Sequence, residues 1–124
     1  MLVLKRISVL LATLVLFTHV SAATAPVIER EVVPLTIPQK IVKYANVYHA
    51  DAGVITNVMK CESSFNPNAV GDNGTSFGLS QIHLPAHPDI TKEQALDEDF
   101  AIIYMAKNIT TNPRQWSCYR MLYE

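Results

Sequence analysis

The first 23 residues most limit what this chain can fold into, because they have the pattern of a segment that is cleaved off and so does not contribute to the folded domain. Lys5 and Arg6 precede an apolar run over residues 7–20, and small residues follow at positions 21–23. A basic start, an apolar centre and a small-residue end are typical of a secretory signal peptide. An uncleaved membrane anchor is the alternative, but the run is shorter than the roughly 20 apolar residues of a span. We predict a signal peptide over residues 1–23 and contact with a membrane only through it, before cleavage.

Removal of this segment would leave about 100 residues, enough for one small domain and too few for two. The whole chain has 124 residues, of which 17% are charged, and a formal net charge of -1. This composition excludes a disordered acidic chain and a nucleic-acid binder held by a basic surface. We expect a monomeric protein that is secreted or that stays in the periplasm or cell envelope.

The chain has two cysteines, Cys61 and Cys118. Outside the cytoplasm such a pair is most simply a disulfide. A thiol nucleophile and a metal site are the alternatives, but there is no CxxC motif and no second ligand at zinc-like spacing from either cysteine. His83 and His87 are four residues apart, yet Pro85 between them breaks a helical metal pair. We predict a Cys61–Cys118 disulfide, no bound metal and no cofactor.

Prolines separate an N-terminal arm from the rest of the expected mature chain. Pro26, Pro34 and Pro38 exclude a long helix over residues 24–38. We expect an extended arm or linker over these residues and the folded domain over residues 39–124.

Two apolar patterns at the start of the expected domain predict helices. Apolar side chains recur every three or four residues from Ile41 to Tyr48, and this helix should end near Gly53. A second stripe, from Val54 to Met59, leads to Glu62. Glu62 should therefore lie at the C-terminal end of a mostly buried helix, where the helix dipole disfavours another negative charge.

The second half of the chain predicts one small β-hairpin and three more helices. Asn73 followed by Gly74 is a strong signal for a tight turn between short strands. Helix-start signals then occur at Thr91 with Gln94 three residues later, at Asp97, and at Asn112 before Pro113. The Asp97 helix should end around residues 108–111, and the last helix should be short and run through Trp116. The expected fold class is α+β, predominantly α-helical, with one small β-hairpin.

The chemistry of the chain is concentrated in two blocks, residues 62–70 and 76–82. In the first, Glu62 ends an apolar helix and turn residues follow it; the second is a polar segment that contains a glycine. The helix end and the hairpin would face each other across a groove, with the Glu62 carboxyl at its bottom. Apolar walls disfavour the carboxylate anion and raise the pKa of the acid. An acid that keeps its proton near neutral pH can serve as a general acid.

These two blocks resemble the signature of the soluble lytic transglycosylase (SLT) domains, relatives of goose-type lysozyme. The matching positions are Glu62, Ser63, Phe65, Pro67 and Ala69 in the first block, and Gly78, Leu79, Gln81 and Ile82 in the second. The resemblance spans roughly residues 39–124, with the dense motif over 62–82. It implies a lysozyme-like fold that cleaves the β-1,4 bond between N-acetylmuramic acid and N-acetylglucosamine in peptidoglycan.

The resemblance also implies that Glu62 is the single catalytic residue. It would protonate the glycosidic oxygen and then act as a base toward the incoming nucleophile, which is either water or the muramic acid 6-hydroxyl. The 6-hydroxyl gives a 1,6-anhydro product. The N-acetyl group of the substrate would stabilise the positive anomeric carbon, so that a second enzyme carboxylate is not required.

Further residues are implied to bind the sugar. Ser76, Gly78 and Gln81 would form the groove wall, where Gly78 permits close approach to the backbone and Gln81 offers both a donor and an acceptor. The Ala-Tyr-Asn-Ala-Gly block of the family is absent. We expect Tyr104 or Tyr119 to take the place of its tyrosine.

Several interpretations compete with a catalytic one. Without the motif, Glu62 is a helix-terminal carboxylate that happens to be paired. Asp72 can be a second carboxylate that activates water, although its place next to Asn73 and Gly74 favours a role in the turn. We therefore expect a lytic transglycosylase that acts on the glycan strands of peptidoglycan. The alternatives are a hydrolytic muramidase and a non-catalytic peptidoglycan-binding module.

Overall fold

The computed structural model describes residue 18 and residues 20–124. The predicted signal peptide, residues 1–23, therefore lies largely outside the described residues. Residues 20–36 have no helix or strand, and their side chains are exposed. Among the described residues, no helix combines the length and the apolar character that crossing a membrane requires. The chain divides into two units, Met1–Val32 and Val33–Glu124, and the second contains all the secondary structure described below.

Two helices of 12 residues open the folded unit: α1 spans Ile37–Tyr48 and α2 spans Ala52–Ser63. Helix α1 thus begins two residues before the expected start of the domain. Its first turn contains Pro38, and a proline is tolerated there because its missing N–H would have no partner within the helix.

The predicted end of the first helix near Gly53 is wrong, because Gly53 lies in the first turn of α2. The chain breaks earlier, at His49, whose left-handed conformation (φ 54°) closes α1. This conformation is usually given to glycine at helix ends. Asp51 then opens α2, where its carboxylate accepts a hydrogen bond from the N–H of Val54 at 3.0 Å.

The remaining elements alternate short strands with short helices. They are β1 (Val70–Gly71), β2 (Ser76–Phe77), β3 (Ile82–His83), the 3-10 turn η1 (Leu84–Ala86), α3 (Lys92–Leu96), α4 (Glu98–Asn108), the 3-10 turn η2 (Pro113–Gln115) and α5 (Ser117–Tyr123). The predicted α+β, predominantly helical class is confirmed. The expected hairpin gains a third strand, and the three strands pair antiparallel in the order β1-β2-β3.

Two of the three helix-start signals in the second half of the chain act as caps in the structure. Thr91 forms the predicted capping box with Gln94, and Asp97 caps α4 by accepting from the Phe100 N–H at 2.8 Å. The short helix predicted to open at Asn112 and Pro113 begins there as the 3-10 turn η2, but it ends at Gln115 instead of running through Trp116, and the separate helix α5 follows. The Asn112 side chain makes no capping hydrogen bond. The backbone is extended at Trp116 before α5 begins.

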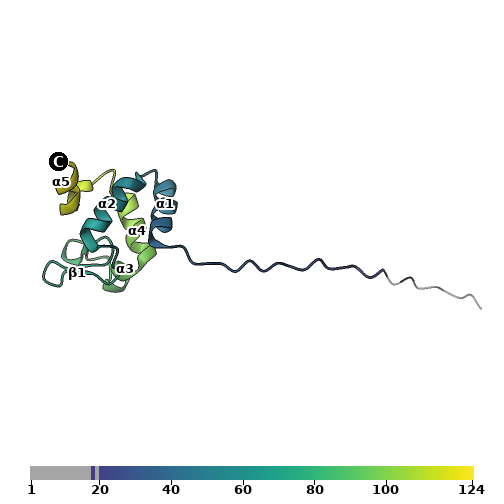
Figure 1. Cartoon of the computed structure of the whole chain (residues 1–124). Coiled ribbons are helices and arrows are strands. Elements are labelled where there is room, and N and C mark those ends of the chain that lie inside the picture. The colour runs from purple at the N-terminus through teal and green to yellow at the C-terminus, as the bar shows by residue number, and fades with distance from the viewer. Residues whose placement is uncertain (1–17, 19) are drawn as a thin grey trace, which may run out of the picture. The chain divides into compact units, whose positions relative to one another are not determined.

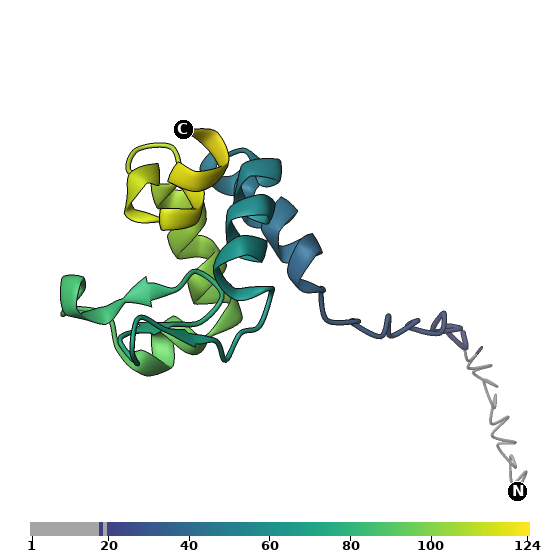
Figure 2. The same cartoon turned by 60° about the vertical axis from the view of Figure 1, so that its left-hand side comes forward.

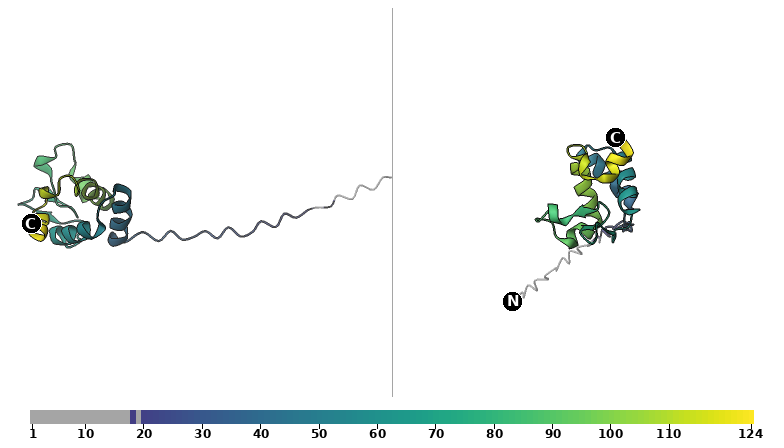
Figure 3. Two further views of the ribbon diagram at one scale, coloured as in Figure 1. Left: turned by 90° about the horizontal axis from the view of Figure 1, so that it is seen from above. Right: turned by 90° about the vertical axis from the view of Figure 1, so that its left-hand side faces the viewer.

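Three helices form the centre of the folded unit. Helix α1 packs against both α2 and α4, and Figures 1 and 2 show these three side by side, with the sheet and α3 at one end and α5 at the other. The two views of Figure 3 show the same grouping from other directions. The main core is formed by the buried side chains of Ile41, Ala45, Ile55, Val58, Met59, Leu79, Ala101, Ile102, Met105, Ala106, Ile109, Trp116 and Cys118.

Two buried hydrogen bonds fix the segment between β2 and β3 onto the helices. The Ser80 hydroxyl is fully buried and donates to the carbonyl of Ala101 in α4 at 2.6 Å. The indole Nε1 of Trp116 donates to the Ser80 carbonyl at 2.9 Å. Because both donors are satisfied in the interior, this segment and the chain before α5 are held in one relative position. That position defines the cleft described next.

Candidate active site

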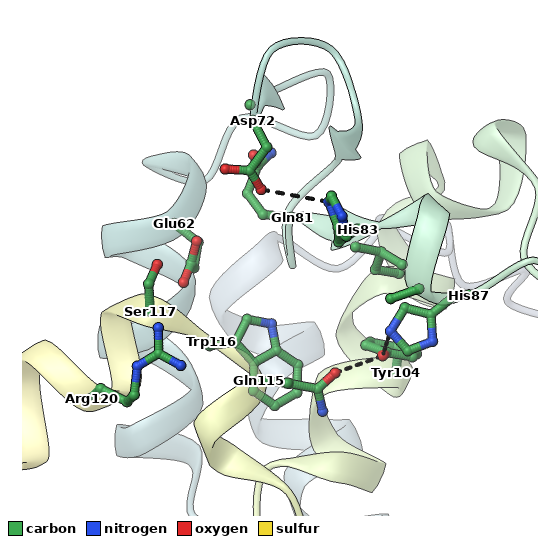
Figure 4. A pocket seen from close by; sticks show the side chains of 13 residues that line it. Glu62, Asp72, Gln81, His83, His87, Tyr104, Gln115, Trp116, Ser117 and Arg120 are labelled. Atoms are coloured by element: carbon green, nitrogen blue, oxygen red, sulfur yellow. Dashed lines mark hydrogen bonds and ion pairs between the residues drawn. The ribbon is translucent and has the colours of Figure 1, made fainter.

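A cleft of about 450 Å³ lies between the end of α2, the small sheet and the segment leading into α5. Figure 4 shows the side chains that line it. The polar ones are Glu62, Asp72, Gln81, His83, His87, Tyr104, Gln115, Ser117 and Arg120. The cleft thus contains two carboxylates, two imidazoles and one guanidinium, which is a composition suited to proton transfer.

Glu62 enters the cleft from the last turn of α2 and is half-buried. Its carboxylate oxygen Oε1 accepts a hydrogen bond from the backbone N–H of Cys118 in α5, at 3.1 Å. The acid is therefore held from both sides: its own helix carries the side chain, and a helix 56 positions later in the chain supplies the donor.

The surroundings of Glu62 raise its pKa above that of an ordinary glutamate. Burial is the largest cause, because it disfavours the charged form. The N–H of Cys118 opposes it, the negative charge of Asp72 raises the pKa again, and Ser117 and Arg120 lower it. The net effect is an acid that holds its proton to higher pH than a solvated glutamate does.

The predicted disulfide is confirmed: Cys61 and Cys118 are joined, with their Cα atoms 5.9 Å apart. Cys61 directly precedes Glu62 in α2, and Cys118 is the residue whose N–H binds the Glu62 carboxylate. The crosslink therefore holds together the two backbone segments that orient the acid.

A second carboxylate, Asp72, lines the cleft from the turn between β1 and β2. Its Oδ2 accepts a hydrogen bond from the hydroxyl of Ser76, which is fully buried. His83 Nδ1 lies 3.8 Å from the same oxygen. Ser76 does not line the cleft itself; the structure places it behind Asp72, where it orients the carboxylate.

Gln81 lines the cleft and Gly78 does not. The Gln81 amide donates to the carbonyls of Ala69 at 3.2 Å and Gly78 at 3.1 Å, which leaves its own oxygen free of these contacts. At Gly78 (φ 77°) a Cβ atom would stand 1.8 Å from the carbonyl oxygen of Ala95. The close approach that this glycine permits is therefore to the end of α3.

Of the two expected tyrosines, Tyr104 lines the cleft and Tyr119 does not. The Tyr104 hydroxyl donates to Gln115 Oε1 at 2.7 Å and lies 2.9 Å from His87 Nε2. Burial raises the pKa of Tyr104, and the charge of Asp89 adds to the effect. The Tyr119 ring instead packs against that of Tyr123 in the same helix, with centroids 5.1 Å apart.

The structure adds cleft residues that the motif does not contain. Ser117 and Arg120 lie on α5, His83 on β3, and His87 directly after η1. Ser117 and Arg120 carry no motif of their own. The expected disulfide is the signal in the sequence for them, because it brings the neighbours of Cys118 to those of Cys61.

A protein metal site needs three or four ligating side chains around one point. Across residue 18 and residues 20–124, no group of three or more histidine, cysteine, aspartate or glutamate side chains is arranged to hold a metal ion. The charged side chains of the cleft are Glu62, Asp72 and Arg120.

Comparison with known proteins identifies the family. No curated protein and no solved structure is significantly similar to the chain. The sequence model of the transglycosylase SLT domain matches residues 39–116, which is more than half of the chain and contains Glu62 and both motif blocks. Domains of this kind have a lysozyme-like α+β fold and act on peptidoglycan in the cell envelope. The chain therefore belongs to the transglycosylase SLT domain family.

Proposed function

We propose that this protein is a lytic transglycosylase that cleaves the β-1,4 bond between N-acetylmuramic acid and N-acetylglucosamine, with Glu62 as general acid and base. The observation that carries the proposal is the position of Glu62: half-buried in a cleft, with a raised pKa and with one carboxylate oxygen held by the Cys118 N–H. A protonated, oriented carboxylic acid is what departure of the glycosidic oxygen requires.

The reaction would proceed in two proton transfers. Glu62 gives its proton to the glycosidic oxygen as the bond to the anomeric carbon breaks, and the N-acetyl group of the muramic acid stabilises the positive centre. The resulting carboxylate then accepts the proton of the muramic acid 6-hydroxyl as this oxygen attacks the same carbon. The products are a 1,6-anhydromuramic acid end and a free 4-hydroxyl on the departing strand, and Glu62 is protonated again.

We assign sugar-binding roles according to where each side chain lies. Gln81 and Tyr104 line the cleft and would contact the glycan directly. Ser76 would act through Asp72, to which its hydroxyl is bonded. Gly78 and Tyr119 would support the wall from outside the cleft, through their contacts with Ala95 and Tyr123.

The substrate also implies a location. Peptidoglycan lies outside the cytoplasmic membrane, and residues 1–23 have the pattern of an export signal. We propose that the protein is exported, as a monomer, and that its disulfide forms in the compartment where the glycan strands are met.

Hydrolysis is the second candidate reaction, and Asp72 is the observation that favours it. This carboxylate lines the same cleft as Glu62, close enough that its charge raises the pKa of the acid. Two carboxylates across a sugar-binding cleft are the usual arrangement of enzymes that activate water. The products would then be reducing ends.

The test compares the mature protein with its Glu62→Gln variant on purified peptidoglycan. Soluble products are identified by mass spectrometry, and the matched control is Glu93→Gln, an exposed acid of α3. We expect anhydro-muropeptides from the wild type and the control, and a rate lower by about 10³-fold for Glu62→Gln, because general acid catalysis contributes factors of this order. If none of the three proteins releases product while all of them sediment with the wall, the protein is a binding module.

A further inference from the structure

The proton on the His83 ring can be placed by accounting for its neighbours. Nδ1 of His83 lies 3.2 Å from the Ser76 hydroxyl and 3.3 Å from the Thr75 hydroxyl. The Ser76 proton is already donated to the Asp72 carboxylate, and the Thr75 proton to the Asp72 carbonyl at 2.7 Å. Both hydroxyls can therefore act toward Nδ1 only as acceptors. The Asp72 carboxylate, 3.8 Å from Nδ1, likewise has no proton to donate. Hence Nδ1 carries the proton.

This tautomer leaves the lone pair of the neutral ring on Nε2. Every polar contact of the His83 side chain within the described part of the chain is made by Nδ1, and Nε2 lies on the other side of the ring. His83 lines the cleft and its side chain is 48% exposed, so that water can reach it. The ring thus presents a base, with its tautomer determined, at a solvated part of the cleft.

The Asp72 carboxylate lies near the same nitrogen of the His83 ring as the two hydroxyls. The Asp72 Oδ2 lies 3.8 Å from Nδ1, so that the carboxylate stands on the side of the ring opposite Nε2. A carboxylate on the Nδ1 side of an imidazole is also found in serine hydrolases, where it is buried and bonded directly to the ring; here the Ser76 and Thr75 hydroxyls lie closer to Nδ1 than the carboxylate does. Asp72 is held in turn by the buried hydroxyl of Ser76. Figure 4 shows Asp72 and His83 facing each other, with Glu62 on another wall of the cleft.

We infer that His83 is a general base that activates water for attack on the anomeric carbon, so that this residue sets how much of the cleavage ends in hydrolysis. This inference rests on the proposed cleavage by Glu62, and it explains how a second product, the reducing end, would form. In this scheme Asp72 does not activate the water itself: Asp72 and Ser76 are positioning residues for His83.

The two reactions share their first step and diverge at the second. After Glu62 has protonated the departing oxygen, the anomeric carbon is positive. Water attacks it, its oxygen forms the new bond to this carbon, and one of its protons passes to Nε2 of His83. The result is a reducing end and a protonated imidazole, which returns its proton through solvent to the Glu62 carboxylate. In the competing path the 6-hydroxyl attacks and an anhydro end forms.

The test measures the ratio of reducing to anhydro ends for the wild type and His83→Asn on purified peptidoglycan. Asparagine can keep a donor near the position of Nδ1 but has no basic nitrogen, so that the network around Asp72 is preserved. We expect reducing ends to form about 10²-fold more slowly in the variant, the lower limit for a lost general base, while anhydro ends continue to form. His49→Asn is the matched control, because His49 lies at the end of α1 in a left-handed conformation that asparagine tolerates.

Two further measurements separate a base from a structural residue. Added imidazole should restore the formation of reducing ends by a His83→Ala variant. When the ratio of reducing to anhydro ends is plotted against pH, the rise of the wild-type curve that comes from His83 should be absent in His83→Asn. The other titratable groups of the cleft, Glu62, Asp72, His87, Tyr104 and Arg120, are the same in both proteins, and thermal melting verifies that the variants fold.

Each outcome decides between the two proposals. An unchanged ratio in His83→Asn would overturn the role of His83 and leave the cleavage by Glu62 in place. The same holds if the wild type forms anhydro ends alone. If the wild type releases neither product, the proposed function fails and the role of His83 fails with it.

Discussion

At the scale of single residues, Gly78 shows how one backbone position constrains the packing beside the site. It has a left-handed φ of 77°, and a Cβ there would stand 1.8 Å from the Ala95 carbonyl oxygen. Gly74, in the turn between β1 and β2, also has a left-handed φ, of 87°, but a Cβ there would meet nothing within 4 Å. A side chain at Gly74 would therefore cost only backbone strain, whereas a side chain at Gly78 would cost the same strain and a steric clash with Ala95.

We predict that Gly78→Ala lowers the free energy of unfolding by about 3 kcal/mol, at the high end of single substitutions. Gly74→Ala should cost about 1 kcal/mol, the strain of a left-handed alanine alone. Urea denaturation of both variants measures the difference. Equal costs would show that the end of α3 moves aside for the added methyl group.

At the scale of elements, the pair α2 and α5 positions the acid. The two helices are joined by the Cys61–Cys118 disulfide and by the hydrogen bond from the Cys118 N–H to Glu62. Helix α5 has seven residues, with Met121, Leu122 and Tyr123 exposed, and buries only Cys118. So short a helix has little packing of its own, and therefore we expect its position to depend on the crosslink.

Reduction of the disulfide should lower stability and peptidoglycan cleavage together. With a separation of 57 residues between the cysteines, the chain-entropy model assigns the crosslink about 4 kcal/mol. For a domain of this size that corresponds to a melting temperature lower by about 20 °C. Activity should fall because the Cys118 N–H leaves the Glu62 carboxylate. Thermal melting and product release are measured with and without reductant.

The control for this prediction is a Cys61→Ser, Cys118→Ser double variant. Its melting temperature and activity should match those of the reduced wild type and should not respond to reductant. Full activity of the reduced protein at a temperature where it remains folded would contradict the proposed link between the crosslink and the acid.

At the scale of the whole molecule, the charges of the cleft act across it from different elements. Asp72, on the sheet side, raises the pKa of Glu62, whereas Arg120 and Ser117, on α5, lower it. Because the pKa of Glu62 is raised, the protonated acid persists to higher pH, and we expect the proposed cleavage to be lost as the pH rises through this pKa. The folded state also loses stability over the same interval, from the ordinary pKa of glutamate to the raised one.

We predict that Asp72→Asn lowers the pKa of Glu62, because a negative charge that disfavours the carboxylate is removed. Cleavage should then be lost at a lower pH than in the wild type. An NMR titration of the Glu62 side chain measures the shift directly, and Glu93→Gln controls for the change in net charge. High salt should narrow the difference, since Asp72 is exposed. An unchanged titration of Glu62 in Asp72→Asn would refute the coupling.

The parts of the fold that follow from neighbouring residues could be predicted from the sequence. The capping box at Thr91 and the cap at Asp97 need only residues three positions away, and the position of Glu62 in the last turn of α2 follows from an apolar stripe. The break at His49 could not be predicted, because only a few per cent of residues other than glycine take the left-handed conformation that ends α1. Helix α5 was missed because its seven residues have no cap and bury a single side chain.

The sequence by itself determined the acid, the helix that carries it, the motif around it and the two cysteines, because each is encoded by residue type and short-range spacing. Only the tertiary structure decided what surrounds the acid. The N–H of Cys118 comes from 56 positions away, Ala95 closes on Gly78, and the His83 proton is placed by hydroxyls that the turn between β1 and β2 brings to it. These contacts form when the packing of α4 and Trp116 against the Ser80 segment brings separate parts of the chain together, and no local pattern encodes that packing.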